Sequence, residues 1–255
     1  MIDSKTDDRV RNRLLDIPKR IMLSPYHGAL VAGERSARYV RSLGVAAEHI
    51  ASHYNTLDIA SLRVLTAGMA ASKFSARPFL IVARLIPEKN LSVALEAYSR
   101  YRKSGGKRRL SVIGEGPEGD RLQAQARRLS ISDAIEWCGS RSRAEVAASM
   151  RQALALLLPS MSETYGLVVI EALAQGLPVI VSTRAGVVDL PVTNGNGAVL
   201  IDPQNVAGIE QAMRELDCGE AEWKVWSDAA SAAAGKADAR HFAASVVQLA
   251  GLEQH

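Results

Sequence analysis

Residues 79–113 read FLIVARLIPEKNLSVALEAYSRYRKSGGKRRLSVI. They begin with an apolar run at 79–83, continue with an amphipathic stretch at 91–102, and end on a second apolar run at 110–113. Runs that are apolar throughout indicate strands covered on both faces, and their alternation with amphipathic stretches is typical of parallel strands joined by crossover helices. The segment therefore predicts an α/β fold with a doubly wound parallel sheet.

The same alternation continues along the chain. Further strands are expected at 134–138, 154–158, 178–182 and 198–201, and helices at 117–129 with Pro117 in the first turn, 144–151, 168–175, 205–216, 220–234 and 237–249. We expect the last two helices to pack across the sheet. The prediction is one nucleotide-type domain over residues 76–217, followed by C-terminal helices over 218–255 that pack back across the domains.

The first 75 residues differ from the rest of the chain. An irregular charged segment up to residue 20 precedes one predicted strand at 29–32 and one helix at 34–43, which Gly44 ends. These elements make a single βα unit, whereas a second doubly wound domain would need several more strands. Residues 1–75 are therefore predicted to be the remnant of a second α/β domain and a linker.

The composition excludes several classes of protein. Of the 255 residues, 47% are apolar, and 31 Lys and Arg against 27 Asp and Glu give a net charge of only +4, which does not favour a nucleic-acid partner. The longest apolar run, 153–158, is far shorter than the roughly 20 residues of a membrane span, and the start of the chain is too polar for a signal peptide. We expect a cytoplasmic protein with reduced cysteines.

A glycine-rich stretch follows the predicted strand at 110–113. Gly114, Gly116 and Gly119 match G-x-G-x-x-G, and Glu136 lies near the place of a ribose-binding acid, so this pattern alone favours NAD and an oxidoreductase. The same glycines are also compatible with a tight turn that faces any phosphate or sugar nucleotide. Both interpretations remain open on these residues.

Two cations follow the strand predicted at 79–83. Arg84 lies at its carboxyl end and Lys89 five residues later, where the loops of open α/β sheets gather ligand groups. A bidentate guanidinium and a compact ammonium suit a diphosphate and need no metal. The alternative is that both are solvated charges at the start of a helix.

The stretch SETYGLVVIEALAQG, residues 162–176, carries two acids. Glu163 belongs to the loop after a strand, and Glu171 lies about one turn into the next predicted helix. Gly166 would let the free amides of residues 166–168 approach an anion, while carboxylates accept hydrogen bonds from sugar hydroxyls. Alternatively, Glu171 only occupies the favourable first turns of a helix and Glu163 is a surface charge.

Together these stretches resemble the retaining glycosyltransferases of the GT-B fold that are called group 1 or family 4. The segments that carry the resemblance, within residues 20–251, are FLIVARLIPEKNLSVALEAY, RRLSVIGEGPEGDRLQAQA, IEWCGS, LLLPSMSETYGLVVIEALAQGLPVIVS and LIDPQNVAGIEQAM. The resemblance implies transfer of a hexosyl-type sugar, with retention and without metal or other cofactor, from a UDP-, GDP- or ADP-linked donor to a hydroxyl of a glycan or lipid-linked acceptor.

The resemblance also implies roles for individual residues. Arg84 and Lys89 would hold the donor diphosphate, and Glu163 the transferred sugar, so these three form the expected catalytic group. The expected donor-binding residues are Gly114, Gly116, Cys138, Gly139, Ser140, Gly166, Leu167, Val168 and Glu171. Within that set, Glu171 would bind the ribose hydroxyls and residues 138–140 would lie beside the base.

The sequence departs from the family in two places. Residues 185–189 read AGVVD where the family usually has Gly-Gly-x-Pro-Glu. Residues 28–58 resemble only the last βα unit and linker of the family's acceptor domain. The alternative to an active transferase is therefore a donor-binding subunit, or a truncated pseudoenzyme, that needs a partner chain to supply the acceptor domain.

Several smaller features have two interpretations. The basic residues of 100–109, and Arg35, Arg38 and Arg41 at a spacing of three, form either a solvated face or a peripheral contact with the inner face of a membrane. Trp223 and Trp226 are expected to pack the terminal helix against the domain. His49 and His53 have helical spacing but no neighbouring carboxylates, so no metal site is expected there.

Overall fold

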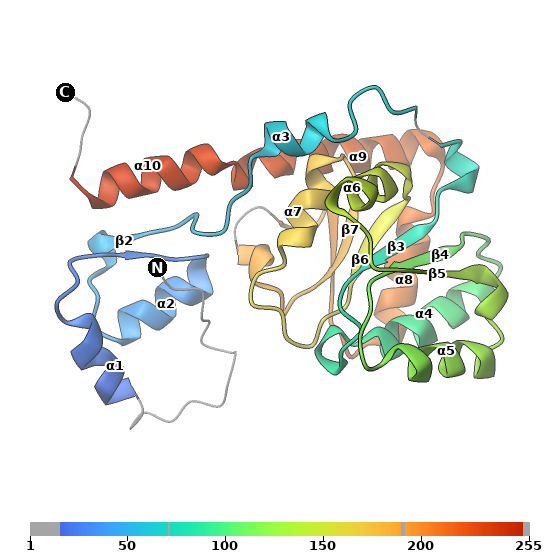
Figure 1. Ribbon diagram of the computed structural model, residues 1–255, viewed down its shortest axis with the longest axis horizontal. Helices are drawn as coiled ribbons and strands as arrows, with labels where there is room; N and C mark the ends of the chain where they lie inside the picture. The colour runs from blue at the N-terminus through green and yellow to red at the C-terminus, as the bar shows by residue number, and fades with distance from the viewer. Residues whose placement is uncertain (1–15, 71, 190–191, 252–255) are drawn as a thin grey trace.

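A six-stranded parallel sheet forms the centre of the computed structural model, which describes residues 16–70, 72–189 and 192–251 (Figure 1). Its strands lie in the order β5-β4-β3-β6-β7-β8 and pair in parallel throughout. Their bounds are β3 Phe79–Val82, β4 Leu110–Ile113, β5 Ile135–Gly139, β6 Ala155–Leu158, β7 Val179–Ser182 and β8 Ala198–Ile201. The predicted doubly wound α/β fold is confirmed.

Helices cover both faces of this sheet, and an apolar core lies between the sheet and the helices on each face. Leucines, alanines and tyrosines of α4, α5 and α8 pack on one face, while apolar residues of α6, α7 and α9 pack on the other. The bounds are α4 Leu91–Lys103, α5 Gly119–Arg128, α6 Arg143–Gln152, α7 Leu167–Ala174, α8 Val206–Leu216 and α9 Glu220–Ala234. We call the sheet with these helices the main domain.

The strand order reverses between β3 and β6, which are paired neighbours although they are far apart in sequence. The loops leaving such neighbours diverge to opposite faces of the sheet, and the crevice between them is where open α/β sheets bind ligands. All four residues of β6 are buried, and so are those of β7. Burial of each leucine, isoleucine or valine side chain in these strands contributes roughly 1.5–3 kcal/mol to the stability of the sheet from which these loops leave.

Residues 16–51 form a small α/β unit beside the main domain (Figure 1). Two parallel strands, β1 (Ala29–Leu30) and β2 (Ile50–Ala51), flank α2 (Glu34–Ser42). The second strand was not predicted, because Ile50 and Ala51 stand between His49 and Ser52 and belong to no longer apolar run. The expectation of an irregular segment up to residue 20 is wrong for residues 16–20, which belong to α1 (Asp16–Leu23), while the earlier part of that segment lies outside the described residues. We call residues 16–51 the N-terminal unit.

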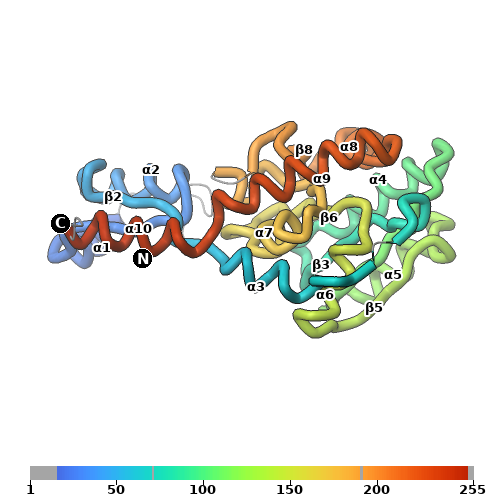
Figure 2. Tube along the Cα trace, turned by 90° about the horizontal axis from the view of Figure 1, so that it is seen from above, coloured from blue at the N-terminus to red at the C-terminus, as the bar shows by residue number. Residues whose placement is uncertain are grey.

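The C-terminal helices separate after α9. Helix α9 packs on α7, and Trp223 is 8% exposed and donates from Nε1 to the Leu154 carbonyl at 2.7 Å, as expected of an anchoring residue. Helix α10 (Ala239–Leu249) instead packs against β1 and β2, as Figure 2 shows from above. The expectation that both helices cross the main sheet is therefore wrong for α10.

The start of α5 and two short helices differ from the predicted elements. Helix α5 begins at Gly119, so Pro117 lies in the preceding turn and not in the first turn of the helix. Helix α3 (Ile59–Val64) and the short 3-10 helix η6 (Gly186–Asp189) were not predicted at all. Both lie near the site, and α3 packs on α7 while η6 contacts α2 of the N-terminal unit.

Candidate functional site

Asn90 connects three loops at the carboxyl edge of the sheet by hydrogen bonds. It follows β3, has a left-handed backbone with φ 55°, and donates from Nδ2 to the carbonyls of Pro159 after β6 (3.2 Å) and Pro203 after β8 (2.7 Å). In addition, the amide of Met161 donates to the Glu88 carbonyl at 2.8 Å. These bonds fix the loop that carries Lys89 against the loop that carries Glu163.

Lys89 and Glu163 form an ion pair between these two loops. Nζ of Lys89 donates to Oε2 of Glu163, and the two side chains are only 16% and 14% exposed. Restricted solvent access makes such a charge-assisted bond stronger than one at an open surface. The structure thus places together two of the three residues expected to be catalytic.

Arg84 lies at the same edge but is exposed. Its carbonyl accepts a hydrogen bond from the amide of Ile86 at 3.0 Å. Its guanidinium makes no hydrogen bond or ion pair with any residue that the structure describes. It is therefore a cation that can turn toward a ligand without first breaking a described contact.

The glycine-rich turn has a structural explanation. Gly114 has φ 135°, and a Cβ there would lie 1.9 Å from the carbonyl oxygen of Ala83; at Gly116 a Cβ would lie 2.4 Å from that of Leu85. The amide of Leu85 donates to the Glu115 carbonyl at 2.9 Å. The close approach of two protein loops thus requires glycine at these two positions. This packing explains the G-x-G pattern without a bound NAD.

Residues 138–140, expected beside the base, adjoin this turn. The carbonyl of Gly139 accepts from the amide of Gly114 at 2.8 Å, and the amide of Ser140 donates to Oε1 of Glu115 at 3.1 Å. Partial burial raises the pKa of the Cys138 thiol. The thiol is therefore protonated at neutral pH and acts as a small packing group.

The amino end of α7 lies next to Glu163. Gly166 precedes the helix with φ 103°, and a Cβ there would lie 3.4 Å from Cγ of Glu163. The amides of Leu167 and Val168 belong to the first turn, where backbone N–H groups have no acceptor within the helix. Gly166 is buried and Leu167 is 42% exposed, and free amides at a helix start are suited to an anion.

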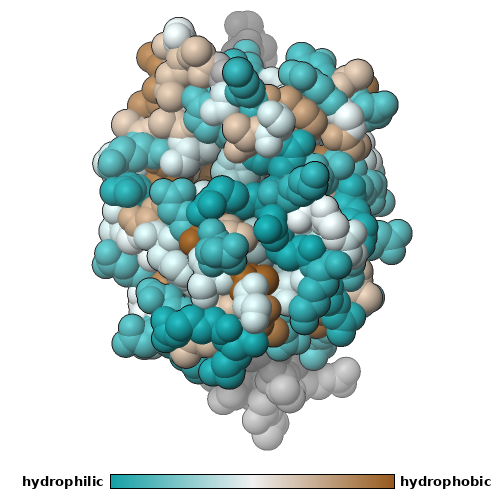
Figure 3. Space-filling model, turned by 90° about the vertical axis from the view of Figure 1, so that its right-hand side faces the viewer, coloured by the Kyte–Doolittle hydropathy of each residue, from teal (hydrophilic) through white to brown (hydrophobic). Residues whose placement is uncertain are grey.

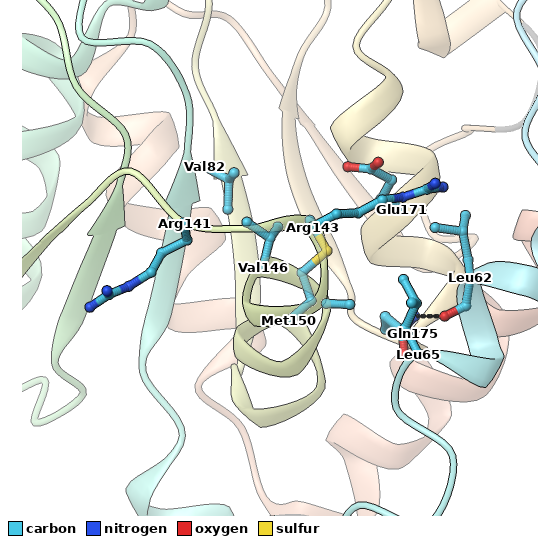
Figure 4. Close-up of a pocket in the computed structure, with 10 residues that line it drawn as sticks. Leu62, Leu65, Val82, Arg141, Arg143, Val146, Met150, Glu171 and Gln175 are labelled. Atoms are coloured by element: carbon cyan, nitrogen blue, oxygen red, sulfur yellow. Dashed lines mark hydrogen bonds between the residues drawn. The ribbon is translucent and has the colours of Figure 1, made fainter.

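Glu171 lies on α7 in a separate pocket of about 210 Å³ (Figure 4). Val82 at the end of β3 lines the same pocket. The pocket therefore lies beside the point where the strand order reverses. Burial raises the pKa of the Glu171 carboxyl, and the positive charge of Arg143 lowers it again in part. Figure 4 shows the Arg143 side chain alongside this carboxylate.

Sequence reasoning missed several residues of this pocket. Arg141 and Arg143 follow β5 and line it, together with Leu62 and Leu65 from the segment around α3. The two arginines could have been found by the same rule of strand ends that singled out Arg84. The leucines could not, because nothing in a short amphipathic segment indicates which cavity it covers.

The structure therefore arranges the predicted residues in three groups, one of which is the glycine-rich turn with the adjoining residues 138–140. Lys89, Glu163 and the start of α7 form one cluster, with Arg84 exposed at the same edge, whereas Glu171 lines the neighbouring pocket.

Teal, hydrophilic side chains cover much of the face of the molecule that Figure 3 presents. Among the described residues, no three His, Cys, Asp or Glu side chains gather as a metal site would require. Across the same residues, every helix is too short or too polar to cross a membrane.

Comparison with known proteins gives a consistent result. Residues 73–230 match the family model described as "Glycosyl transferases group 1". A glycogen synthase of Mycobacterium tuberculosis is 34% identical over 167 residues, which are 62% of this chain and 40% of that protein. The chain thus spans less than half the length of this relative.

Solved structures share the fold at low sequence identity. The lipopolysaccharide outer core galactosyltransferase WaaB superposes with a TM-score of 0.74 and 22% identity, over 91% of this chain and 64% of that one. Anabaena HepE in complex with UDP superposes with a TM-score of 0.77 and 16% identity, over 95% and 69%. The likeness extends over nearly all of this chain, so it includes the N-terminal unit.

Proposed function

Because this chain belongs to the group 1 glycosyl transferases, we propose that it binds a nucleoside-diphosphate sugar and transfers the sugar to an acceptor hydroxyl with retention of configuration. The observation that carries this proposal is the cluster of Lys89, Glu163 and the first turn of α7 at one edge of the sheet. A cation, a carboxylate and free amides within one cluster suit the phosphate and sugar of such a donor.

The cluster acts on the leaving group. As the bond between the anomeric carbon and the phosphate oxygen breaks, the electron pair passes to the diphosphate, where Arg84, Lys89 and the amides of α7 stabilise the new charge. A single preorganised donor of this kind is worth roughly 2.7–4 kcal/mol in other enzymes. These groups supply the positive charge that a metal would otherwise supply to the departing diphosphate. The proposed reaction is therefore metal-independent.

Glu163 binds the sugar. Its carboxylate already accepts from Lys89, so a donor whose phosphate engages Lys89 leaves carboxylate lone pairs for a sugar hydroxyl. The acceptor hydroxyl attacks the anomeric carbon on the face from which the diphosphate departs, and its proton passes to a departing phosphate oxygen. No covalent nucleophile is needed for retention by this route.

The nucleoside occupies the neighbouring surface. Glu171 in the pocket beside β3 accepts from the ribose hydroxyls, and residues 138–140 lie beside the base. HepE was solved with UDP, which makes UDP the first donor nucleotide to test, with GDP and ADP beside it. The proposed setting is the cytoplasm, and a hexose is the proposed transferred group.

A second candidate function is donor binding without transfer. The observation behind it is that the two strands of the N-terminal unit have only two residues each. A partner chain would then complete the acceptor site. A glycan acceptor and a lipid-linked acceptor at a membrane face are the two acceptor classes proposed.

A nucleotide panel tests the proposal. UDP, GDP, ADP and NAD are added separately while the melting temperature is measured, since a ligand that binds only the folded state raises the midpoint. We expect one of the diphosphates to stabilise the protein and NAD to have no effect. Stabilisation by NAD alone would reject the function, and transfer of a radiolabelled sugar would distinguish the enzyme from the donor-binding subunit.

A further inference from the structure

Arg35 of the N-terminal unit contacts the segment 183–189 of the main domain through all three nitrogens of its guanidinium group. Nε donates to Oδ1 of Asp189 at 2.7 Å, Nη1 donates to the carbonyl of Thr183 at 3.2 Å, and Nη2 donates to the carbonyl of Ala185. Both side chains of the ion pair are 11% exposed. The contact is thus a multidentate bond with little access for water, unlike the usual pair on a protein surface.

The start of α2 is fitted to the same aspartate. The backbone amide of Arg35 donates to Oδ2 of Asp189 at 2.9 Å. A Cβ on Gly33, the residue that precedes the helix, would lie 2.6 Å from Cβ of Asp189. Asp189 therefore caps α2 from another part of the fold, where a negative charge also favours the helix dipole.

The segment that Arg35 holds lies directly alongside the loop of Glu163. Glu163 and Ala185 form a parallel β-bridge, and the amide of Gly186 donates to the Glu163 carbonyl at 3.2 Å. The amide of Val187 donates to the Tyr165 carbonyl at 2.8 Å. Any displacement of 183–189 must therefore move the backbone from which the Glu163 side chain projects.

We propose that Arg35 and Asp189 are positioning residues, through which the N-terminal unit sets the orientation of Glu163 and hence the affinity for the sugar part of the donor. This proposal rests on the function proposed above. It also gives a role to Asp189 within residues 185–189, the stretch where the sequence departs from its family.

The geometry distinguishes this role from general stabilisation. The N-terminal unit is attached to the rest of the chain elsewhere too, because α10 packs on β1 and β2. Loss of Arg35 therefore leaves the unit attached on that side. It releases the contact between α2 and the segment 183–189 (Figure 1).

Hydrogen exchange measures the mechanical part of the proposal and needs no ligand. In Arg35→Ala, the amides of Gly186 and Val187 should exchange at least tenfold faster than in wild type. Arg38→Ala is the matched control, because Arg38 lies on the same helix, is 57% exposed and pairs only with Glu34 among the contacts described. Equal protection of both amides in wild type, Arg35→Ala and Arg38→Ala would overturn the proposal.

Ligand affinity measures the functional part. Calorimetry would compare UDP with UDP-glucose, or the corresponding pair for the base that the nucleotide panel selects. We expect Arg35→Ala and Asp189→Asn to lose about tenfold in affinity for the nucleotide sugar and less than twofold for the nucleotide alone. Arg35→Lys, which keeps a charge for Asp189 but cannot bond both carbonyls, should lie between wild type and Arg35→Ala.

The outcomes separate the two proposals. If wild type prefers the nucleotide sugar and Arg35→Ala keeps that preference, the positioning role is wrong while the proposed function stands. If wild type binds neither ligand, the proposed function is wrong, and the exchange rates alone then decide whether Arg35 holds the segment. A uniform loss for both ligands would identify a merely structural role and overturn the proposal.

Discussion

The main domain and the N-terminal unit are held together in different ways. Strands of four or five residues, buried between two layers of helices, make up the main domain. The N-terminal unit has two strands of two residues each, and its own core consists of the buried Ala29, Val31, Ala37 and Val40. Helix α10 packs on its two strands, and Arg35 pairs with Asp189 of the main domain. The position of the N-terminal unit therefore depends on contacts with residues that are distant in sequence.

The largest effect should come from a cavity in the main core. Leu156→Ala, at a fully buried position in β6, should cost about 2–5 kcal/mol in the free energy of unfolding. All three tryptophans lie outside the N-terminal unit, so urea unfolding followed by their fluorescence reports the main domain.

Val40→Ala, at an equally buried position in α2, is the matched variant. It removes two methylene equivalents, worth about 1.6 kcal/mol, from the smaller core and should barely shift the fluorescence midpoint. A shift in the fluorescence midpoint of Val40→Ala that matches this loss of about 1.6 kcal/mol would mean that the two regions unfold as one unit, which would contradict the comparison.

The next effect concerns the turn between β4 and α5. Gly114→Ala combines a positive φ with a Cβ 1.9 Å from the Ala83 carbonyl, whereas Gly105→Ala has φ 97° and open space around the new methyl. We expect Gly105→Ala to cost about 1–2 kcal/mol from backbone strain alone and Gly114→Ala clearly more. Thermal unfolding of the pair measures the difference, and equal costs would remove the proposed close approach of the two loops.

A moderate effect is expected in the pocket of Glu171. Glu171→Ala should reduce the preference for a ribonucleotide over its 2′-deoxy analogue by about tenfold, because the ribose hydroxyl loses its acceptor. Glu145→Ala, an exposed acid in α6 that serves its own helix cap, is the control and should retain the preference. Calorimetry with the two nucleotides makes the comparison, and an unchanged preference in Glu171→Ala would place the ribose elsewhere.

The smallest effect is a pH dependence where the linker meets α10. His53 stacks on His241 with ring centroids 5.1 Å apart, and burial, followed by the charge of His241, lowers the pKa of His53 from 6.5. The unfolded chain then binds more protons than the folded one, so stability should fall as the pH drops through 6.5 toward the lower pKa of the folded state.

Thermal unfolding between pH 7.5 and 5 measures this loss. His53→Asn tolerates the local φ of 70° and should weaken the dependence, while His49→Asn, which removes an exposed imidazole, should keep it. The opposite order of the two variants would show that the stacked pair does not link pH to stability.

Residue patterns predict the main domain well because each of its elements carries its own signal. Several strands are apolar throughout, and the loops after β3 and β6 carry Arg84, Lys89 and Glu163, so the rule of strand ends is enough to indicate this edge of the sheet as the site. Lys89 and Glu163 do meet, although their ion pair joins loops 74 residues apart.

Other features could not be read from the sequence, for identifiable physical reasons. Ile50 and Ala51 belong to no longer apolar run, so β2 gave no signal. An amphipathic helix has an apolar face but does not say what covers it, which is why α10 was expected on the wrong sheet. Asp189 and Arg35 are 154 residues apart, and their pairing depends on how two regions dock.

The most direct test of the account is the selectivity of nucleotide binding in variants of the two cations. Calorimetry would compare the preferred nucleoside diphosphate with its monophosphate in wild type, Arg84→Ala, Lys89→Ala and the exposed control Lys107→Ala. Loss of a charged hydrogen bond should weaken diphosphate binding about tenfold or more in the first two variants, leave the monophosphate within about twofold, and spare Lys107→Ala. Equal losses for both nucleotides, or no loss in Arg84→Ala and Lys89→Ala, would contradict the central claim that these cations hold the distal phosphate.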